Sequence, residues 1–313
     1  MSTPQQPPII EVSGLRKSFG DTIAVDGLSF KVRPGSILGL LGPNGAGKTT
    51  TIKMLTTLLS IDSGAASVAG FDVATQPRMV RQAIGLAGQA AAVDDKLTAR
   101  ENLDLFGRLY HIPADQRKQR TEELIERFDL TELADRPAGT YSGGQRRRLD
   151  VVASLIVDPP ALFLDEPTTG LDPRSRAEIW GAIRSLASQG TAVVLTTQYL
   201  DEADQLSDDI VVIDRGRVVG EGTAAELKSS LERDVLEVTV AEAGTRDRAA
   251  GLLDGSEVVA IDETTLQLPV NRPADSLAAL RRVQDAGIEI ADFQLRKPTL
   301  DDVFLALTGE PTS

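Results

Sequence analysis

A glycine-rich stretch constrains the fold of this chain more than any other feature of its sequence. Residues 42–49 read GPNGAGKT, which fits the pattern G-x-x-x-x-G-K-[ST], and they follow the apolar run SILGLL. In the order strand, loop, helix, such a pattern lets backbone N–H groups surround phosphate oxygens at a helix N-terminus. The residues that we expect to bind a nucleotide here are Gly42, Pro43, Asn44, Gly45, Ala46, Gly47, Lys48, Thr49 and Thr50.

Two side chains of this stretch have specific expected roles. Lys48 would reach the β- and γ-phosphates and act in catalysis, and Thr49 would supply a hydroxyl ligand to Mg²⁺. The alternative is a glycine-rich turn that holds no ligand.

Composition narrows the class of protein further. The chain has 313 residues, enough for about two domains, and its 46 acidic and 33 basic residues give a net charge of −13. That charge disfavours binding to nucleic acid through the field of the whole molecule. With no cysteine and one histidine, His111, thiolate and histidine-rich metal sites are excluded, whereas oxygen-ligated Mg²⁺ is not. No segment resembles a secretion signal or a membrane span, so we expect a cytoplasmic chain.

The order of predicted strands and helices divides the chain into two domains. In residues 1–230 strands alternate with helices, which predicts an α/β fold with a mostly parallel sheet and a helical subdomain at about 90–157. Residues 231–313, with 16 acidic and 8 basic side chains, read as β-α-β-β-α-β, the ferredoxin-like order of a small α+β domain. The elements expected there are strands at 235–241, 256–261, 264–270 and 288–295 and helices at 245–253 and 274–285. A less regular α+β domain is the alternative.

A pair of carboxylates ends the apolar strand ALFLD of residues 161–165. Asp165 would hold Mg²⁺ through water, and Glu166 would orient and deprotonate an attacking water. The alternative is that the pair only caps the next helix. Beside a phosphate-binding loop, the pair indicates an ATPase.

A second candidate phosphate site precedes another predicted helix. It consists of a hydroxyl, two glycines and an amide at the helix N-terminus: Ser142, Gly143, Gly144 and Gln145. One chain then has two segments that can bind a γ-phosphate. We therefore expect the second segment to bind the γ-phosphate of a nucleotide held by another copy. The alternative is a simple N-cap.

These motifs, in this order and spacing, resemble those of the nucleotide-binding subunits of ABC transporters, over roughly residues 9–223. The resemblance implies that Phe19 stacks on adenine and that Gln89 links Mg²⁺ to the helical subdomain. Asp172 matches the loop that lies between two protomers. Without the other motifs, the alternative is a core aromatic for Phe19 and a surface polar residue for Gln89.

Two positions depart from the pattern of that family. Tyr141 replaces the usual leucine before Ser142, and we expect little effect on function. Gln198 replaces the usual histidine after the strand TAVVLTT. Its amide can bond a γ-phosphate oxygen but cannot titrate near neutrality, so catalysis would rest on Glu166 as the base.

Longer segments narrow the resemblance. Four of them are similar to segments of the daunorubicin-resistance type of drug-export ATPase subunit. They are YSGGQRRRLD, LDEPTTGLDPRSR, TTQYLDEAD and the terminal PTLDDVFLALTG. The resemblance implies a homodimer around two ATP and two Mg²⁺, on the cytoplasmic face of the membrane. It also implies a separate permease, contacted by the helical subdomain around residues 89–110, and export of an amphipathic drug, antibiotic or lipid.

Three alternatives remain at this point. A soluble ABC-type ATPase would act on ribosomes or nucleic acid without a permease, an importer would use the second domain as a sensor, and an idle module would bind ATP without hydrolysis. The transported molecule, the permease, the role of the second domain and the effect of Gln198 on turnover are not specified. At helical spacing, Leu103, Phe106, Leu109 and Trp180 are expected in the core, and residues 146–148 form either a solvated face or an approach for anions.

Overall fold

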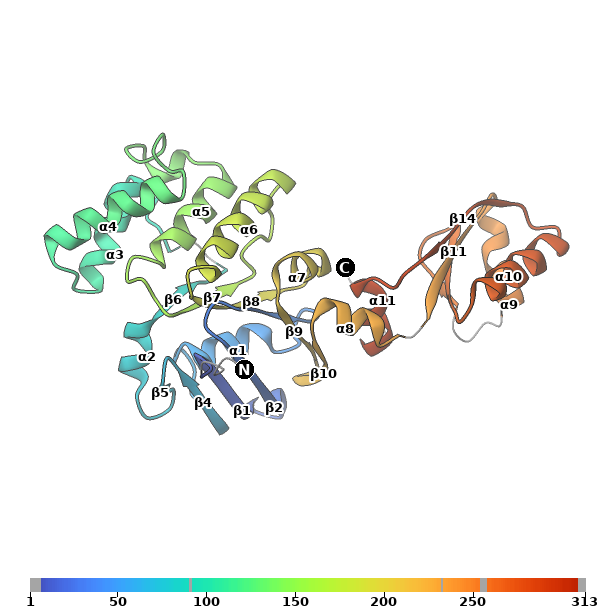
Figure 1. The fold of residues 1–313 in the computed structure, drawn as a ribbon, viewed down its shortest axis with the longest axis horizontal. Helices are drawn as coiled ribbons and strands as arrows, with labels where there is room; N and C mark the ends of the chain where they lie inside the picture. Colours follow the sequence, from blue (N-terminus) through green and yellow to red (C-terminus); the bar gives the residue numbers. More distant parts are fainter. Residues whose placement is uncertain (1–6, 90–91, 232, 254–257, 309–313) are drawn as a thin grey trace, which may run out of the picture. The chain divides into compact units, whose positions relative to one another are not determined.

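A computed structural model describes residues 7–89, 92–231, 233–253 and 258–308. The chain divides into two compact units between Ala224 and Ala225 (Figure 1). Each unit has a hydrophobic core of its own.

The first unit is built on a six-stranded sheet in the order β10-β9-β3-β8-β7-β6. All neighbouring strands are parallel except the edge pair β9 and β10, which confirms the predicted α/β fold. Side chains of the central strands are buried on both faces: Leu162 and Leu164 pack in one core and Phe163 in the other. The strands are β3 (Ile37–Leu41), β6 (Ile84–Ala87), β7 (Ala161–Asp165), β8 (Ala192–Thr197), β9 (Asp209–Asp214) and β10 (Arg217–Gly222).

An antiparallel sheet in the order β2-β1-β4-β5 packs with helix α1 against one face of the six-stranded sheet (Figure 1). These elements are β1 (Ile10–Phe19), β2 (Thr22–Val32), β4 (Ser63–Val68), β5 (Phe71–Asp72), α1 (Lys48–Leu55) and α2 (Pro77–Ala83). The arrangement places the loop before α1 at the carboxyl ends of the central parallel strands, where ligands of α/β sheets bind.

Helices lie on the other side of the six-stranded sheet. They are α3 (Ala99–Leu109), α4 (Ala114–Arg127), α5 (Gly143–Ala153), α6 (Pro173–Ala187) and α7 (Leu200–Leu206), with a 3₁₀ turn at Ala138–Thr140. Helices α5, α6 and α7 pack on the strands of the sheet, and α3 and α4 pack beyond α5. Helix α3 begins with a capping box, in which Thr98 and Glu101 bond each other's backbone N–H.

The predicted core positions on these helices are only partly confirmed. Leu103 is fully buried, and Phe106 and Trp180 are partly buried against the same core. The prediction for Leu109 is wrong, because this side chain is 65% exposed. Leu109 is the last residue of α3, and the chain turns at His111, which has a φ of 60°, before α4 begins.

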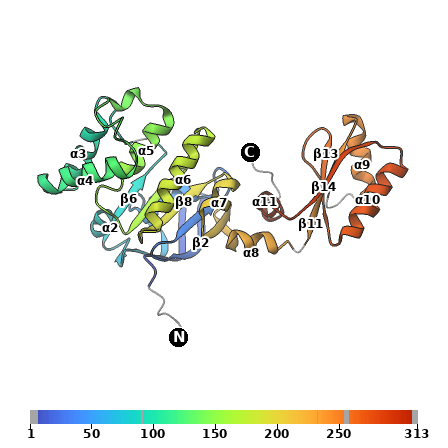
Figure 2. The ribbon, with the colours of Figure 1, turned by 45° about the horizontal axis from the view of Figure 1, so that its top comes forward.

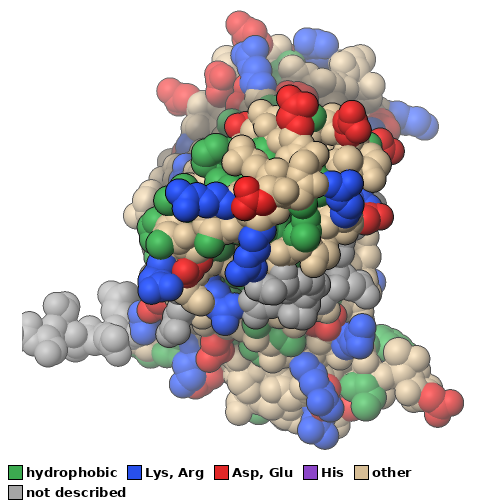
Figure 3. All heavy atoms as spheres, turned by 90° about the vertical axis from the view of Figure 1, so that its right-hand side faces the viewer, with side chains coloured by type: hydrophobic (Ala, Val, Ile, Leu, Met, Phe, Trp, Pro, Cys, Tyr) green, Lys and Arg blue, Asp and Glu red, His purple; other side chains and the backbone are tan. Residues whose placement is uncertain are grey.

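The second unit has the predicted β-α-β-β-α-β order (Figure 2). Its sheet is antiparallel throughout, in the order β12-β13-β11-β14. The elements are α8 (Ala224–Ser229), β11 (Asp234–Val240), a 3₁₀ turn (Ala243–Thr245), α9 (Arg246–Leu252), β12 (Val259–Ala260), β13 (Thr265–Val270), α10 (Pro273–Asp285), β14 (Ile290–Arg296) and α11 (Leu300–Thr308). Of the strand expected at 256–261, residues 256 and 257 lie outside the described residues. The face seen in Figure 3 carries acidic and basic side chains interspersed.

Candidate active site

The glycine-rich loop lies between β3 and α1, as predicted. Gly47, the N-cap of α1, has a φ of 108°, and a Cβ there would stand 2.4 Å from the carbonyl oxygen of Ala24. A Cβ on Gly42 would stand 2.2 Å from the carbonyl oxygen of Ile213. Larger residues therefore do not fit at either position, and the loop is held close to its neighbours with its backbone available to a ligand.

The ammonium of Lys48 is folded back into this loop. It donates to the carbonyl oxygens of Gly42, at 2.7 Å, and Pro43, at 3.1 Å, and the residue is only 5% exposed. Burial lowers the pKa of Lys48 from its ordinary value, and the nearby carboxylates of Glu166 and Asp165 act in the opposite direction. A poorly hydrated cation beside backbone N–H groups is suited to phosphate oxygens.

Asp165 is the centre of a cluster of polar side chains from four segments. Its Oδ1 accepts from Thr49 Oγ1 at 3.0 Å and from Thr196 Oγ1 at 2.6 Å. The amide nitrogen of Gln89 lies 3.4 Å from Thr49 Oγ1. The predicted Mg²⁺ ligands Thr49, Gln89 and Asp165 thus lie together, and their hydroxyl, amide and carboxylate oxygens are donors that Mg²⁺ accepts. The amide would have to turn its oxygen toward the ion.

Glu166 follows Asp165 in a left-handed backbone conformation, with a φ of 49°. This conformation is uncommon for a residue with a side chain. It is held by β8, because the N–H of Glu166 donates to the hydroxyl of Thr196 at 3.0 Å and to its carbonyl at 3.2 Å. The carboxylate is therefore directed by the backbone, and its Oε2 accepts from Thr169 Oγ1 at 3.3 Å.

The segment predicted to face a second copy begins helix α5. Ser142 is its N-cap and forms a capping box with Gln145. Gly143 has open space around it and lines a cleft together with Gln89 and Glu166. Gly144 packs against Ser175 so closely that a Cβ would meet its hydroxyl at 2.3 Å.

The other predicted site residues lie outside the Asp165 cluster. Phe19 ends β1 and is 50% exposed, with the ammonium of Lys17 5.7 Å from its ring centre. Asp172 is the N-cap of α6, where bonds from Ser175 and Arg174 lower the pKa of its carboxyl. Gln198 follows β8 and is half-buried.

Thr196 and Asp150 were not singled out in the sequence, and Arg147 was expected only within a solvated face or an approach for anions at 146–148, which is wrong for this buried side chain. Thr196 supports both carboxylates from β8, where it pairs with Asp165 in register. Arg147 and Asp150 are buried on α5. The available signal was helical spacing, because Gly144, Arg147 and Val151 form one stripe that continues into the apolar part of the helix.

Sequence relatives identify the family. Residues 25–169 match the family model described as ABC transporter, and residues 222–308 match the model of the C-terminal domain of DrrA1-3-like ATP-binding proteins. The chain is 52% identical over 303 residues to the daunorubicin resistance ATP-binding protein DrrA3 of Streptomyces coeruleorubidus, covering 96% of both chains. The chain belongs to the ATP-binding subunits of ABC transporters. It is an ATPase of the daunorubicin-resistance type, as its motifs indicate.

Further relatives agree with this family. The Nod factor export ATP-binding protein I of Ralstonia nicotianae is 41% identical over 305 residues, covering 96% of this chain and 94% of that one. A solved nucleotide-free ATP-binding cassette from an ABC transporter superimposes with a TM-score of 0.65 at 25% identity, covering 72% of this chain and 95% of that one. Among the described residues of the ATPase, helices that combine the length and the apolar character needed to cross a bilayer are absent.

Proposed function

We propose that two copies of this ATPase pair head to tail around two ATP and two Mg²⁺ and power export through a separate permease. Each site would combine Lys48, Thr49, Asp165 and Glu166 of one copy with Ser142 and Gly144 of the other. The observation that carries the proposal is the chain of contacts from Gln89 to Thr49 and from Thr49 to Asp165, with Glu166 next to Asp165. Hydrolysis then opens the pair.

The chemistry follows from the positions of these groups. Lys48 binds the β- and γ-phosphate oxygens, and Thr49, Asp165 and Gln89 would hold Mg²⁺, which supplies positive charge to the phosphates. Glu166 accepts a proton from the attacking water, whose oxygen bonds to the γ-phosphorus as the bond to the bridging oxygen breaks. Gln198 donates an amide hydrogen bond to the γ-phosphate, and Phe19 stacks on the base. The products are ADP and phosphate.

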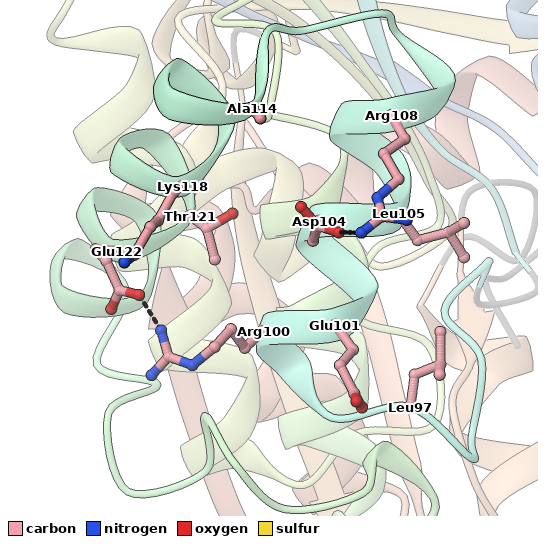
Figure 4. Close-up of a pocket in the computed structure, with 10 residues that line it drawn as sticks. All are labelled: Leu97, Arg100, Glu101, Asp104, Leu105, Arg108, Ala114, Lys118, Thr121 and Glu122. Atoms are coloured by element: carbon pink, nitrogen blue, oxygen red, sulfur yellow. Dashed lines mark hydrogen bonds and ion pairs between the residues drawn. The ribbon is translucent and has the colours of Figure 1, made fainter.

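The permease would dock on the helical part of the ATPase. A groove lies between α3 and α4, and most of its charged side chains are already paired with one another (Figure 4). Arg100 binds Glu122 and Asp135, and Arg108 binds Asp104 at 2.7 Å. Leu105 and Leu109 remain 38% and 65% exposed on α3, so apolar contact is available to a partner there.

Two lines of support favour the proposal that this ATPase serves an exporter of amphipathic molecules at the cytoplasmic face of the membrane. ATP-binding subunits of ABC exporters generally pair with a membrane permease. The relatives named above are resistance proteins for daunorubicin and an export protein for Nod factor. These names support a drug, antibiotic or lipid as the cargo.

The test is to isolate the tagged chain from native membranes with ATP and Mg²⁺ and to identify the attached proteins by mass spectrometry. Recovery of a polytopic membrane protein is the expected result, and it supplies the permease whose cargo can then be assayed. Recovery of ribosomal proteins or nucleic acid, with the chain in the soluble fraction, would overturn the export proposal while leaving the ATPase intact.

A further inference from the structure

One buried arginine on α5 touches both segments that carry the catalytic side chains. Arg147 is 9% exposed, and its guanidinium donates to four backbone carbonyls and one carboxylate. On the side of β7, Nε donates to the carbonyl oxygen of Pro167 at 3.0 Å. Nη2 donates to the carbonyl oxygens of Asp165, at 3.2 Å, and Glu166, at 3.5 Å. Arg147 therefore bonds three consecutive carbonyls around Glu166, those of Asp165, Glu166 and Pro167.

The other edge of the guanidinium holds the segment that contains Gln89. Nη1 donates to the carbonyl of Gly88 and, at 3.0 Å, to Oδ2 of Asp150. Asp150, one turn further along α5 and 3% exposed, accepts the N–H of Ala92 at 2.6 Å through Oδ1. The buried pair thus fixes the chain on both sides of Gln89.

Glu166 is held from two directions as a result. Its N–H is bonded by Thr196 of β8, and its carbonyl is bonded by Arg147 of α5. The left-handed backbone of Glu166 makes the direction of its carboxylate sensitive to both supports. A shift of the Gln89 segment would move the guanidinium and, through it, the peptide groups on either side of Glu166.

We infer that Arg147, held by Asp150, is a positioning residue that couples the Gln89 segment to the carboxylate of Glu166. This inference rests on the proposed function. A buried ion pair is costly to desolvate, and an apolar pair of similar volume usually serves packing equally well. Here four of the five donor contacts go to backbone carbonyls of two catalytic segments, and the fifth goes to Asp150. Lysine cannot reproduce them, because an ammonium lacks the planar fork of guanidinium.

The test compares Arg147→Lys and Asp150→Asn with Arg148→Lys in the full chain with ATP and Mg²⁺. Arg148 is the matched control, because it lies on the same helix and pairs with Glu178. We expect both test variants to lower kcat about 10- to 100-fold, because a small displacement of a catalytic group causes a loss of this size. The KM for ATP should change less than about threefold. All variants are assayed well below their melting temperatures, because breaking a buried ion pair also lowers stability, and Arg148→Lys should retain wild-type turnover.

A double-variant measurement separates positioning from stability. Arg147 acts through Glu166, so Arg147→Lys should change single-turnover hydrolysis less than about threefold when Glu166 is already glutamine. Equal losses in both backgrounds, or turnover that falls only together with melting temperature, would overturn the inference. Should Arg147→Lys fail to fold, Asp150→Asn decides by the same criteria. A wild-type chain that hydrolyses no ATP would instead refute the proposed function.

Discussion

The hydroxyl of Thr49 lies 3.0 Å from the carboxylate of Asp165, although the two residues are 116 positions apart in the chain. The contact forms because β3 and β7 both pair with β8 in parallel, so their carboxyl ends meet at one edge of the sheet. The phosphate-binding loop and the carboxylates are thus brought together by the order of the strands. The predictions below follow from that arrangement.

Glu166→Gln should bind ATP and hydrolyse it at least about 100-fold more slowly than the wild type. The amide has the shape of the carboxylate but cannot accept the proton of water. Because the ATP is not consumed, the variant should stay dimeric. Phosphate release and size-exclusion chromatography with ATP and Mg²⁺ measure both properties, with Glu126→Gln, exposed on α4, as a control that keeps the base. Wild-type turnover in Glu166→Gln would remove Glu166 from the role of base.

Gln198→Ala should lower kcat by about 10- to 100-fold, the value of one hydrogen bond to a charged group. Gln198 follows β8 directly after Thr197 and so stands next to the strand that supports Asp165 and Glu166. Steady-state hydrolysis at saturating ATP is the measurement. Full activity in Gln198→Ala would show that the amide has no part at the γ-phosphate.

Turnover should be flat between about pH 6 and pH 7.5. Histidine is the side chain whose ordinary pKa lies in that window, and the single histidine, His111, lies in the turn after α3. Gln198→His provides the comparison, because an imidazole there should introduce a pH-dependent step near its ordinary pKa of about 6.5. A step of similar size in the wild type would contradict this prediction.

Sequence patterns specified the parallel sheet, the nucleotide loop and the order of elements in the second unit, because buried runs, glycines and helical periods are local signals. They gave less information where a residue's environment depends on distant segments. Helical spacing puts Arg147 on the buried stripe of α5, but it does not specify the partners, because the carbonyls of Gly88 and Pro167 come from distant segments. Leu109 fits the helical period, but its exposure is decided by the turn at His111.

Asp302→Asn should destabilise the second unit by about 1 to 3 kcal/mol at pH 7. Burial by itself raises the pKa of Asp302. Hydrogen bonds from Arg296, at 2.6 and 3.0 Å, and from Thr299 outweigh the effect of burial, so the net pKa is lowered. The folded pKa of Asp302 lies below the unfolded value of about 3.9. The stabilisation is therefore complete at pH values well above the unfolded pKa and is lost as the pH falls through the folded pKa.

Hydrogen exchange of β11 and β14 measures this effect, and fluorescence of Trp180 reports the first unit as an internal control. Protection in the second unit should fall in Asp302→Asn at pH 7, and the difference from wild type should shrink below about pH 4. Unchanged protection at pH 7 would show that the ion pair contributes nothing to the unit's stability.

Leu105→Asp should weaken binding to the permease about tenfold or more and leave basal hydrolysis unchanged. Leu105 lines the α3–α4 groove and is 38% exposed, so a carboxylate there costs little in the free chain but must be desolvated in an apolar interface. Leu58→Asp is the control, because Leu58 is exposed after α1, outside that groove. Co-purification with the permease and ATPase assays of the free chain measure the two properties. Equal recovery of permease with both variants would place the docking surface elsewhere.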